Sequence, residues 1–86
     1  MAQTTTVQIT LDEDEEHTEA RATVRLRDRD FVAGGRARRN PRDPNVPVVG
    51  EELAVARALS DLSHQLLAAA AEVIEGFVGH RVTLDE

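Results

Sequence analysis

The residues of this 86-residue chain best suited to bind a charged partner are four arginines, which are two or four residues apart within each of two segments. They fall in two segments and comprise Arg21, Arg25, Arg36 and Arg38. Side chains separated by two or four positions share one face of a β-strand, so these guanidinium groups would project from one side of a sheet. The anion that such a face binds is a phosphate backbone, an acidic surface on a partner copy, or the chain's own acidic segment.

The charge of the chain is polarised along its length. The formal net charge is −6, from ten arginines, no lysine and sixteen acids. Residues 1–19 carry −6, residues 20–42 carry +6 and residues 43–86 carry −6. The acidic total therefore does not exclude a phosphate partner, but it restricts that partner to the basic middle segment.

Catalytic chemistry has little support in the sequence. Ser60, Asp61 and His64 are close enough in sequence to meet on a helix, but such spacings are common on polar helix faces. Motifs such as a nucleophile elbow, a P-loop or a dinucleotide fingerprint do not occur. The three histidines fall in separate elements and there is no cysteine. We therefore expect no catalytic residues, no cofactor and no metal site.

Hydrophobic periodicity predicts the elements that would position the arginines. Val7, Ile9 and Leu11 alternate with polar residues, which is typical of a half-buried strand, and two further alternating segments follow. Apolar residues then recur at helical spacing from Leu53 to Phe77, and Gly76 or Gly79 ends the run. We predict one α+β domain over residues 1–86, a three-stranded antiparallel meander packed against one long C-terminal helix. Its parts are strands 6–12, 18–27 and 30–39, a connector 40–49, a helix 50–78 and a tail 79–86.

The second and third predicted strands can be placed in register. A two-residue turn at Asp28 and Arg29 would set Leu26 opposite Phe31. The same register sets Arg21 opposite Arg36, and like charges directly across a sheet are destabilising. A nearby anion is therefore expected. Glu51 and Glu52 suit the positive N-terminal end of the predicted helix.

The predicted helix is too long and too apolar for the predicted sheet. It would span about 40 Å, whereas strands of eight residues span about 26 Å. Residues 66–71 are apolar around the whole helix, which one sheet face cannot cover. We therefore expect a homodimer, with a frayed or kinked helix as the alternative. The predicted dimer interface comprises Leu66, Leu67, Ala70, Val73, Ile74 and Phe77.

The sequence predicts a cytoplasmic protein without a membrane partner. It has no apolar run approaching the length of about 18 residues that spans a bilayer. Residues 1–10 lack the basic start and apolar stretch of a signal peptide.

The connector and the helix start also resemble a known family. Residues Asn40–Pro47 and Gly50–Leu62, with the Arg-rich second strand and the Gly/Ala-rich third strand, resemble a small dsRBD-like family of uncharacterised proteins from high-GC Gram-positive bacteria. The resemblance covers residues 6–78. Members of that family resemble ribosome hibernation promoting factors in their dimeric fold, and some are associated with dormancy and hypoxic stress. The resemblance thus implies a non-enzymatic stress protein that binds the ribosome or RNA.

Two functional hypotheses follow. Double-stranded RNA-binding domains contact phosphate at the start of their last helix, but here Glu51 and Glu52 would repel it. Contact with the ribosome or structured RNA would therefore run through the Arg-rich sheet face. The alternative is a homodimeric protein-interaction module whose Arg face pairs with acidic protein surfaces and binds no nucleic acid.

Overall fold

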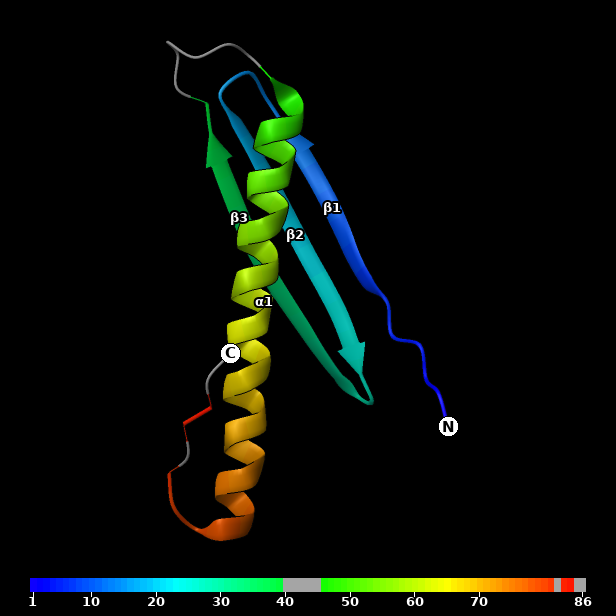
Figure 1. Cartoon of the computed structure of the whole chain (residues 1–86), viewed down its shortest axis with the longest axis vertical. Coiled ribbons are helices and arrows are strands. Elements are labelled where there is room, and N and C mark those ends of the chain that lie inside the picture. The colour runs from blue at the N-terminus through cyan, green and yellow to red at the C-terminus, as the bar shows by residue number, and fades with distance from the viewer. Residues whose placement is uncertain (40–45, 82, 85–86) are drawn as a thin grey trace.

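The fold is a three-stranded antiparallel sheet with one long helix across one of its faces (Figure 1). The computed structural model describes residues 1–39, 46–81 and 83–84. Its elements are β1 (Val7–Glu13), β2 (His17–Leu26), β3 (Arg29–Arg38) and α1 (Pro47–Val78). The strands are ordered β1-β2-β3. The predicted α+β meander with a C-terminal helix is therefore confirmed.

Helix α1 begins three residues before its predicted start. Pro47 occupies the first helical position, where a proline is favoured because its missing N–H would have no partner there. The first turn consequently contains no acid, and the expected placement of Glu51 and Glu52 at the helix start is wrong. Gly79 ends the helix in the left-handed conformation, with φ of 76°. Residues 40–45 of the predicted connector lie outside the described residues.

The register predicted for β2 and β3 is wrong by two residues. The turn lies at Arg27 and Asp28, and Phe31 is opposite Val24 rather than Leu26. A shift of two keeps every side chain on its predicted face, since the period of a strand is two. The observed register replaces the Arg–Arg pair by pairs of opposite charge, which stabilise a sheet. These pairs are Glu19 with Arg36 and Arg25 with Asp30.

The core between the sheet and α1 is built from small residues. Ala22, Ala54 and Ala58 are completely buried, and Leu62 is the only buried side chain of the described residues that is larger than valine. Gly35 lies directly below α1, where a methyl group would overlap the Ala54 carbonyl oxygen and the Ala58 nitrogen. The helix therefore approaches the sheet closely because β3 has no side chain at this position.

Helix α1 also covers the outer edge of β3. Three side chains on successive turns of α1 bind three backbone groups of that edge. Arg57 donates to the Arg36 carbonyl at 2.7 Å, Gln65 donates to the Val32 carbonyl at 2.9 Å, and the Gly34 N–H donates to Asp61 at 3.2 Å. Free backbone groups on an edge strand can pair with another chain, so this ladder blocks such pairing along β3.

Substitution of Gly35 by alanine tests the close approach of α1. We expect Gly35→Ala to lower the free energy of unfolding by about 3 kcal/mol, because an added methyl group forces the helix away from the sheet. Gly34→Ala is the matched control, since a Cβ at Gly34 would meet only the Ala20 oxygen at 3.9 Å. Urea unfolding at one protein concentration measures both. Equal stability of the two variants would contradict the packing described.

Candidate functional site

The four predicted arginines all lie on the outer face of the sheet, away from α1. On β2 and β3 the buried residues alternate with exposed ones, and the buried set includes Ala20, Ala22, Ala33 and Ala37. The positions between them therefore point outward. These outward positions include Arg21, Arg25, Arg36 and Arg38, all of which are exposed.

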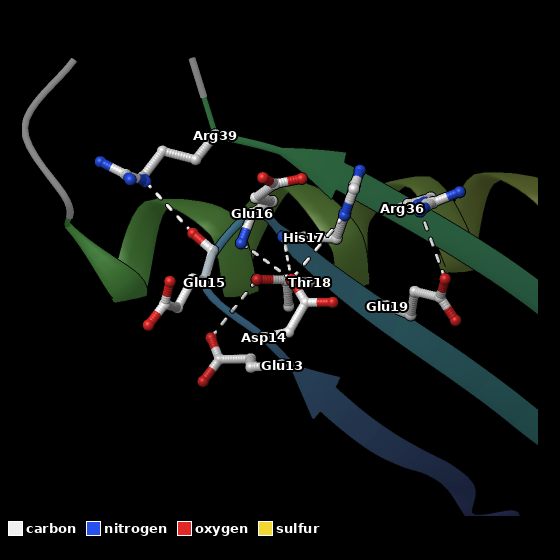
Figure 2. Close-up of polar contacts among 9 residues, drawn as sticks. All are labelled: Glu13, Asp14, Glu15, Glu16, His17, Thr18, Glu19, Arg36 and Arg39. Atoms are coloured by element: carbon white, nitrogen blue, oxygen red, sulfur yellow. Dashed lines mark hydrogen bonds and ion pairs between the residues drawn. The ribbon is translucent and has the colours of Figure 1, made fainter. Parts of the chain in front are cut away.

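Two of the arginines are paired with carboxylates of the same face. The Arg25 guanidinium lies 3.1 Å from both carboxylate oxygens of Asp30. The Arg36 guanidinium lies 3.5 Å from the carboxylate of Glu19 (Figure 2). The anion expected beside the arginines is thus supplied, for these two, by the chain itself. Both pairs are exposed and contribute little to stability, but they remove two isolated positive charges.

The other two arginines form no hydrogen bond or ion pair with the described residues. Arg21 is opposite Thr10 on one side and Gly34 on the other, so it has no like-charged neighbour directly across the sheet. Arg38 is opposite His17. The outer face therefore alternates in charge, and two of its guanidinium groups have no partner within the described part of the chain.

The acidic turn between β1 and β2 is ordered by one of its own carboxylates (Figure 2). Asp14 accepts hydrogen bonds from the backbone N–H groups of Glu16, at 2.8 Å, and His17, at 2.7 Å. Hydrogen bonding from these two N–H groups holds the pKa of the Asp14 carboxyl below its ordinary value. Arg39 joins the turn to the end of β3, since its backbone N–H donates to the Glu16 carbonyl at 2.8 Å. Residues 14–16 thus form an ordered turn.

A hollow of about 650 Å³ lies between this acidic turn and the start of α1. Its lining carries both signs of charge, from Asp14, Glu15, Arg38 and Arg39 among others. No group of three or more side chains placed to hold a metal ion occurs in residues 1–39, 46–81 and 83–84.

Two of the three residues considered for catalysis, Asp61 and His64, have side chains engaged in other contacts. The Asp61 carboxylate accepts the Gly34 N–H and a Gln65 amide hydrogen at 3.3 Å. A ring nitrogen of His64 lies 2.7 Å from the Ser60 backbone carbonyl oxygen one turn earlier. Asp61 therefore serves the edge of β3, and His64 contacts its own helix.

The residues predicted to form a dimer interface occupy two sides of α1. Leu66, Ala70, Val73 and Phe77 recur at intervals of four, three and four residues and share one side. Leu67 and Ile74 lie on the neighbouring side, together with the buried Ala71. Phe77 is 87 % exposed. Among the described residues, α1 has no segment that is both long enough and apolar enough to cross a membrane.

The distribution of apolar side chains is the reverse of that in a compact monomer, because small ones are buried and large ones are exposed. Alanines dominate the core, while Leu11, Leu59, Val73 and Phe77 are among the many large side chains that stay exposed. The accessible surface is 6869 Å², against about 5,000 Å² for a typical monomer of this mass. The radius of gyration is 16.4 Å, against about 12 Å for a typical domain of this length.

Two structural features were missed by reasoning from the sequence. The sequence does contain an indication of the ladder formed by Arg57, Asp61 and Gln65, since these polar residues recur every four positions on a side of the helix that borders the core. The role of Asp14 could also have been suspected from the sequence, because an aspartate in a turn commonly binds the backbone N–H two residues further on. Neither signal identifies its partner without the register of the sheet.

The lowered pKa of Asp14 predicts how the acidic turn responds to pH. A carboxyl with a depressed pKa contributes stability that is complete above its ordinary value of about 3.9 and is lost as the pH falls through the lower folded value. We expect the amide resonances of Glu16 and His17 to titrate with a midpoint below 3.9. In Asp14→Asn, which keeps an acceptor oxygen but no charge, that transition should vanish. A midpoint at or above the ordinary value would contradict the hydrogen bonding described.

Comparison with known proteins places this architecture among mycobacterial proteins. The Rv2632c-like family model matches residues 3–83. An uncharacterised protein of Mycobacterium tuberculosis, MT1780, is 50% identical over 70 residues, which are 81% of this chain and 74% of the relative. The uncharacterised protein Rv2632c of the same organism is 39% identical over 83 residues, which are 96% and 89% of the two chains. The crystal structure of Rv2632c superposes with a TM-score of 0.86 at 38% identity, covering 93% of this chain and 95% of that one. The chain belongs to the Rv2632c-like family.

Proposed function

We propose that the chain is a non-enzymatic, homodimeric protein-interaction module whose outer sheet face binds an acidic protein surface. The proposal separates two surfaces. The outer face of the sheet, with Arg21 and Arg38, recognises the partner. The apolar surface left by the small core supports self-association.

The observation that carries the proposal is the internal pairing of Arg25 with Asp30 and of Arg36 with Glu19. A surface that binds nucleic acid neutralises successive phosphates with unpaired cations, and each added carboxylate works against it. Here paired arginines flank Arg21, which has no partner among the residues that the structure describes, so the face presents positive and negative groups within one area. That pattern favours a protein surface of complementary charges, which can satisfy both signs.

Self-association is supported by how little the core buries. A buried alanine contributes less than a buried leucine or phenylalanine because the stabilisation scales with apolar area. Val7 and Leu11 on β1 and Phe77 on α1 are among the large apolar side chains that stay exposed, and an interface would remove such side chains from water. A second copy of the chain is the simplest source of that cover.

Contact with the ribosome or structured RNA is the second candidate function. Arg21 and Arg38, which have no partner among the described residues, favour it. Stacking aromatics, which single-strand binders use, do not occur on the outward positions of β1, β2 and β3. The two candidates differ in the class of molecule that touches the face, and this can be measured directly.

A photo-crosslinking amino acid at Gly34, the position on β3 opposite Arg21, identifies the class of partner. We expect adducts formed in cells to be sensitive to protease and resistant to nuclease. The double variant Arg21→Glu/Arg38→Glu should lose most of the adduct, because it reverses both unpaired charges. Arg25→Gln/Asp30→Asn is the matched control, since it removes a neutralised pair and should leave the adduct unchanged. Nuclease-sensitive adducts would instead support the RNA candidate and contradict the proposal.

Light scattering tests the homodimer. We expect a mass about twice the 9.4 kDa of the chain at micromolar concentration, because large apolar side chains stay exposed on the single chain. A concentration series should show dissociation only on dilution. A mass of one chain at all concentrations would contradict self-association and leave the interpretation of the outer face unaffected.

A further inference from the structure

The two edges of the sheet differ in how they are covered. Along β3, the backbone groups of Val32, Gly34 and Arg36 are bound by side chains of α1. No side chain of α1 donates to or accepts from the backbone of β1 among the described residues. Figure 1 shows β1 on the side of the sheet away from the β3 edge. An uncovered edge strand with regular alternation is a template for another strand.

The hydrogen bonds at the covered edge of β3 show, through the register, which backbone N–H and C=O groups of β1 point to the open edge. Because the backbone N–H and C=O groups of the even-numbered residues of β3 point to the edge bound by α1, those of its odd-numbered residues hydrogen-bond to β2. In the observed register, Ala33 is opposite Ala22 and Arg21 is opposite Thr10. The alternation across β2 therefore directs Thr10 and its even-numbered neighbours toward β2. The N–H and C=O groups of the odd-numbered residues point to the open edge, and these are Val7, Ile9 and Leu11.

We propose that β1 pairs antiparallel with β1 of a second copy, about a twofold axis at Ile9. This inference rests on the homodimer proposed above and gives it a contact. Pairing centred on Ile9 makes Ile9 face its own copy and sets Val7 opposite Leu11. All three residues have outward backbone groups, so the apolar positions and the hydrogen-bonded positions coincide. A one-residue slip would place apolar side chains opposite polar ones.

Charge is also accommodated in this pairing. The acids at the end of β1, Asp12 and Glu13, come opposite Thr6 and Thr5 of the other copy, rather than opposite each other. The N-terminal threonines have high β-propensity and can extend the strand. The paired segment would therefore run over residues 5–13 of each copy without a like-charge contact across it.

The pairing also closes the sheet. It creates six strands in the order β3-β2-β1-β1-β2-β3, in which both outer edges are β3. Each of these edges is already covered by the ladder of Arg57, Asp61 and Gln65 from its own copy. Assembly therefore stops at two chains, as expected for a symmetric contact that uses the same surface twice.

A cysteine at the twofold axis tests the contact, since the natural chain has no cysteine. Hydrogen-bonded antiparallel partners have Cα atoms about 5.5 Å apart, within the range that a disulfide spans. We expect Ile9→Cys to form a disulfide-linked dimer under mild oxidation. Thr23→Cys, on the central strand, is the matched control and should stay unlinked. Equal linkage of the two variants would overturn the proposal.

Backbone substitution separates the strand contact from side-chain packing. Leu11→Pro removes an outward N–H from an edge strand, where a proline is tolerated, and so removes two hydrogen bonds across the twofold axis. We expect it to weaken dimerisation in sedimentation equilibrium by about tenfold more than Leu11→Thr, which keeps the N–H. Circular dichroism verifies that both variants fold.

Phe77→Ser distinguishes this contact from the helix surface predicted from the sequence. The wild-type chain should be dimeric, and Phe77→Ser should remain dimeric if β1 holds the two copies together. A dimer that is lost on Phe77→Ser, and that Ile9→Cys does not cross-link, overturns the β1 contact alone. A monomeric wild-type chain overturns the homodimer itself.

Discussion

The close approach of α1 to the sheet at Gly35 is the constraint on which most of this structure depends. A methyl group at that position would overlap the backbone of α1, so the helix and β3 meet with almost nothing between them. The neighbouring positions must then be small, which explains why Ala22, Ala54 and Ala58 are completely buried. The short distance also lets side chains of α1 reach past the sheet and bind the backbone of its edge.

A core made in this way has an energetic consequence. Small side chains pack well but remove little apolar surface from water, so the hydrophobic contribution to folding is modest. The larger apolar residues, among them Leu59 and Phe77, are displaced to the outside. The same close approach brings α1 over the edge of β3, whereas no side chain of α1 binds the backbone of β1 among the described residues. An interaction module is the kind of protein in which such a distribution is useful.

Alternation and helical spacing were sufficient to predict the elements and their faces, since these depend only on local periodicity. The four arginines were correctly assigned to the outer face for the same reason. The register was not predictable from the turn, because the shift of two residues that was needed leaves every face unchanged. The observed register avoids the Arg21–Arg36 contact and places Glu19 opposite Arg36. The start of α1 at Pro47 followed from backbone chemistry that outweighed the attraction of Glu51 to the helix start.

The ladder between α1 and β3 has a further geometric consequence. Four residues of a helix advance about 6.0 Å, whereas two residues of a strand advance about 6.6 Å. The two spacings agree well enough for Arg57, Asp61 and Gln65 to find partners in order, but the error accumulates by about 0.6 Å at every step. Side chains of the helix and backbone groups of the strand can therefore remain opposite each other only over a short length. The ladder sets the position of α1 along β3, and the mismatch limits the number of such hydrogen bonds that α1 can form.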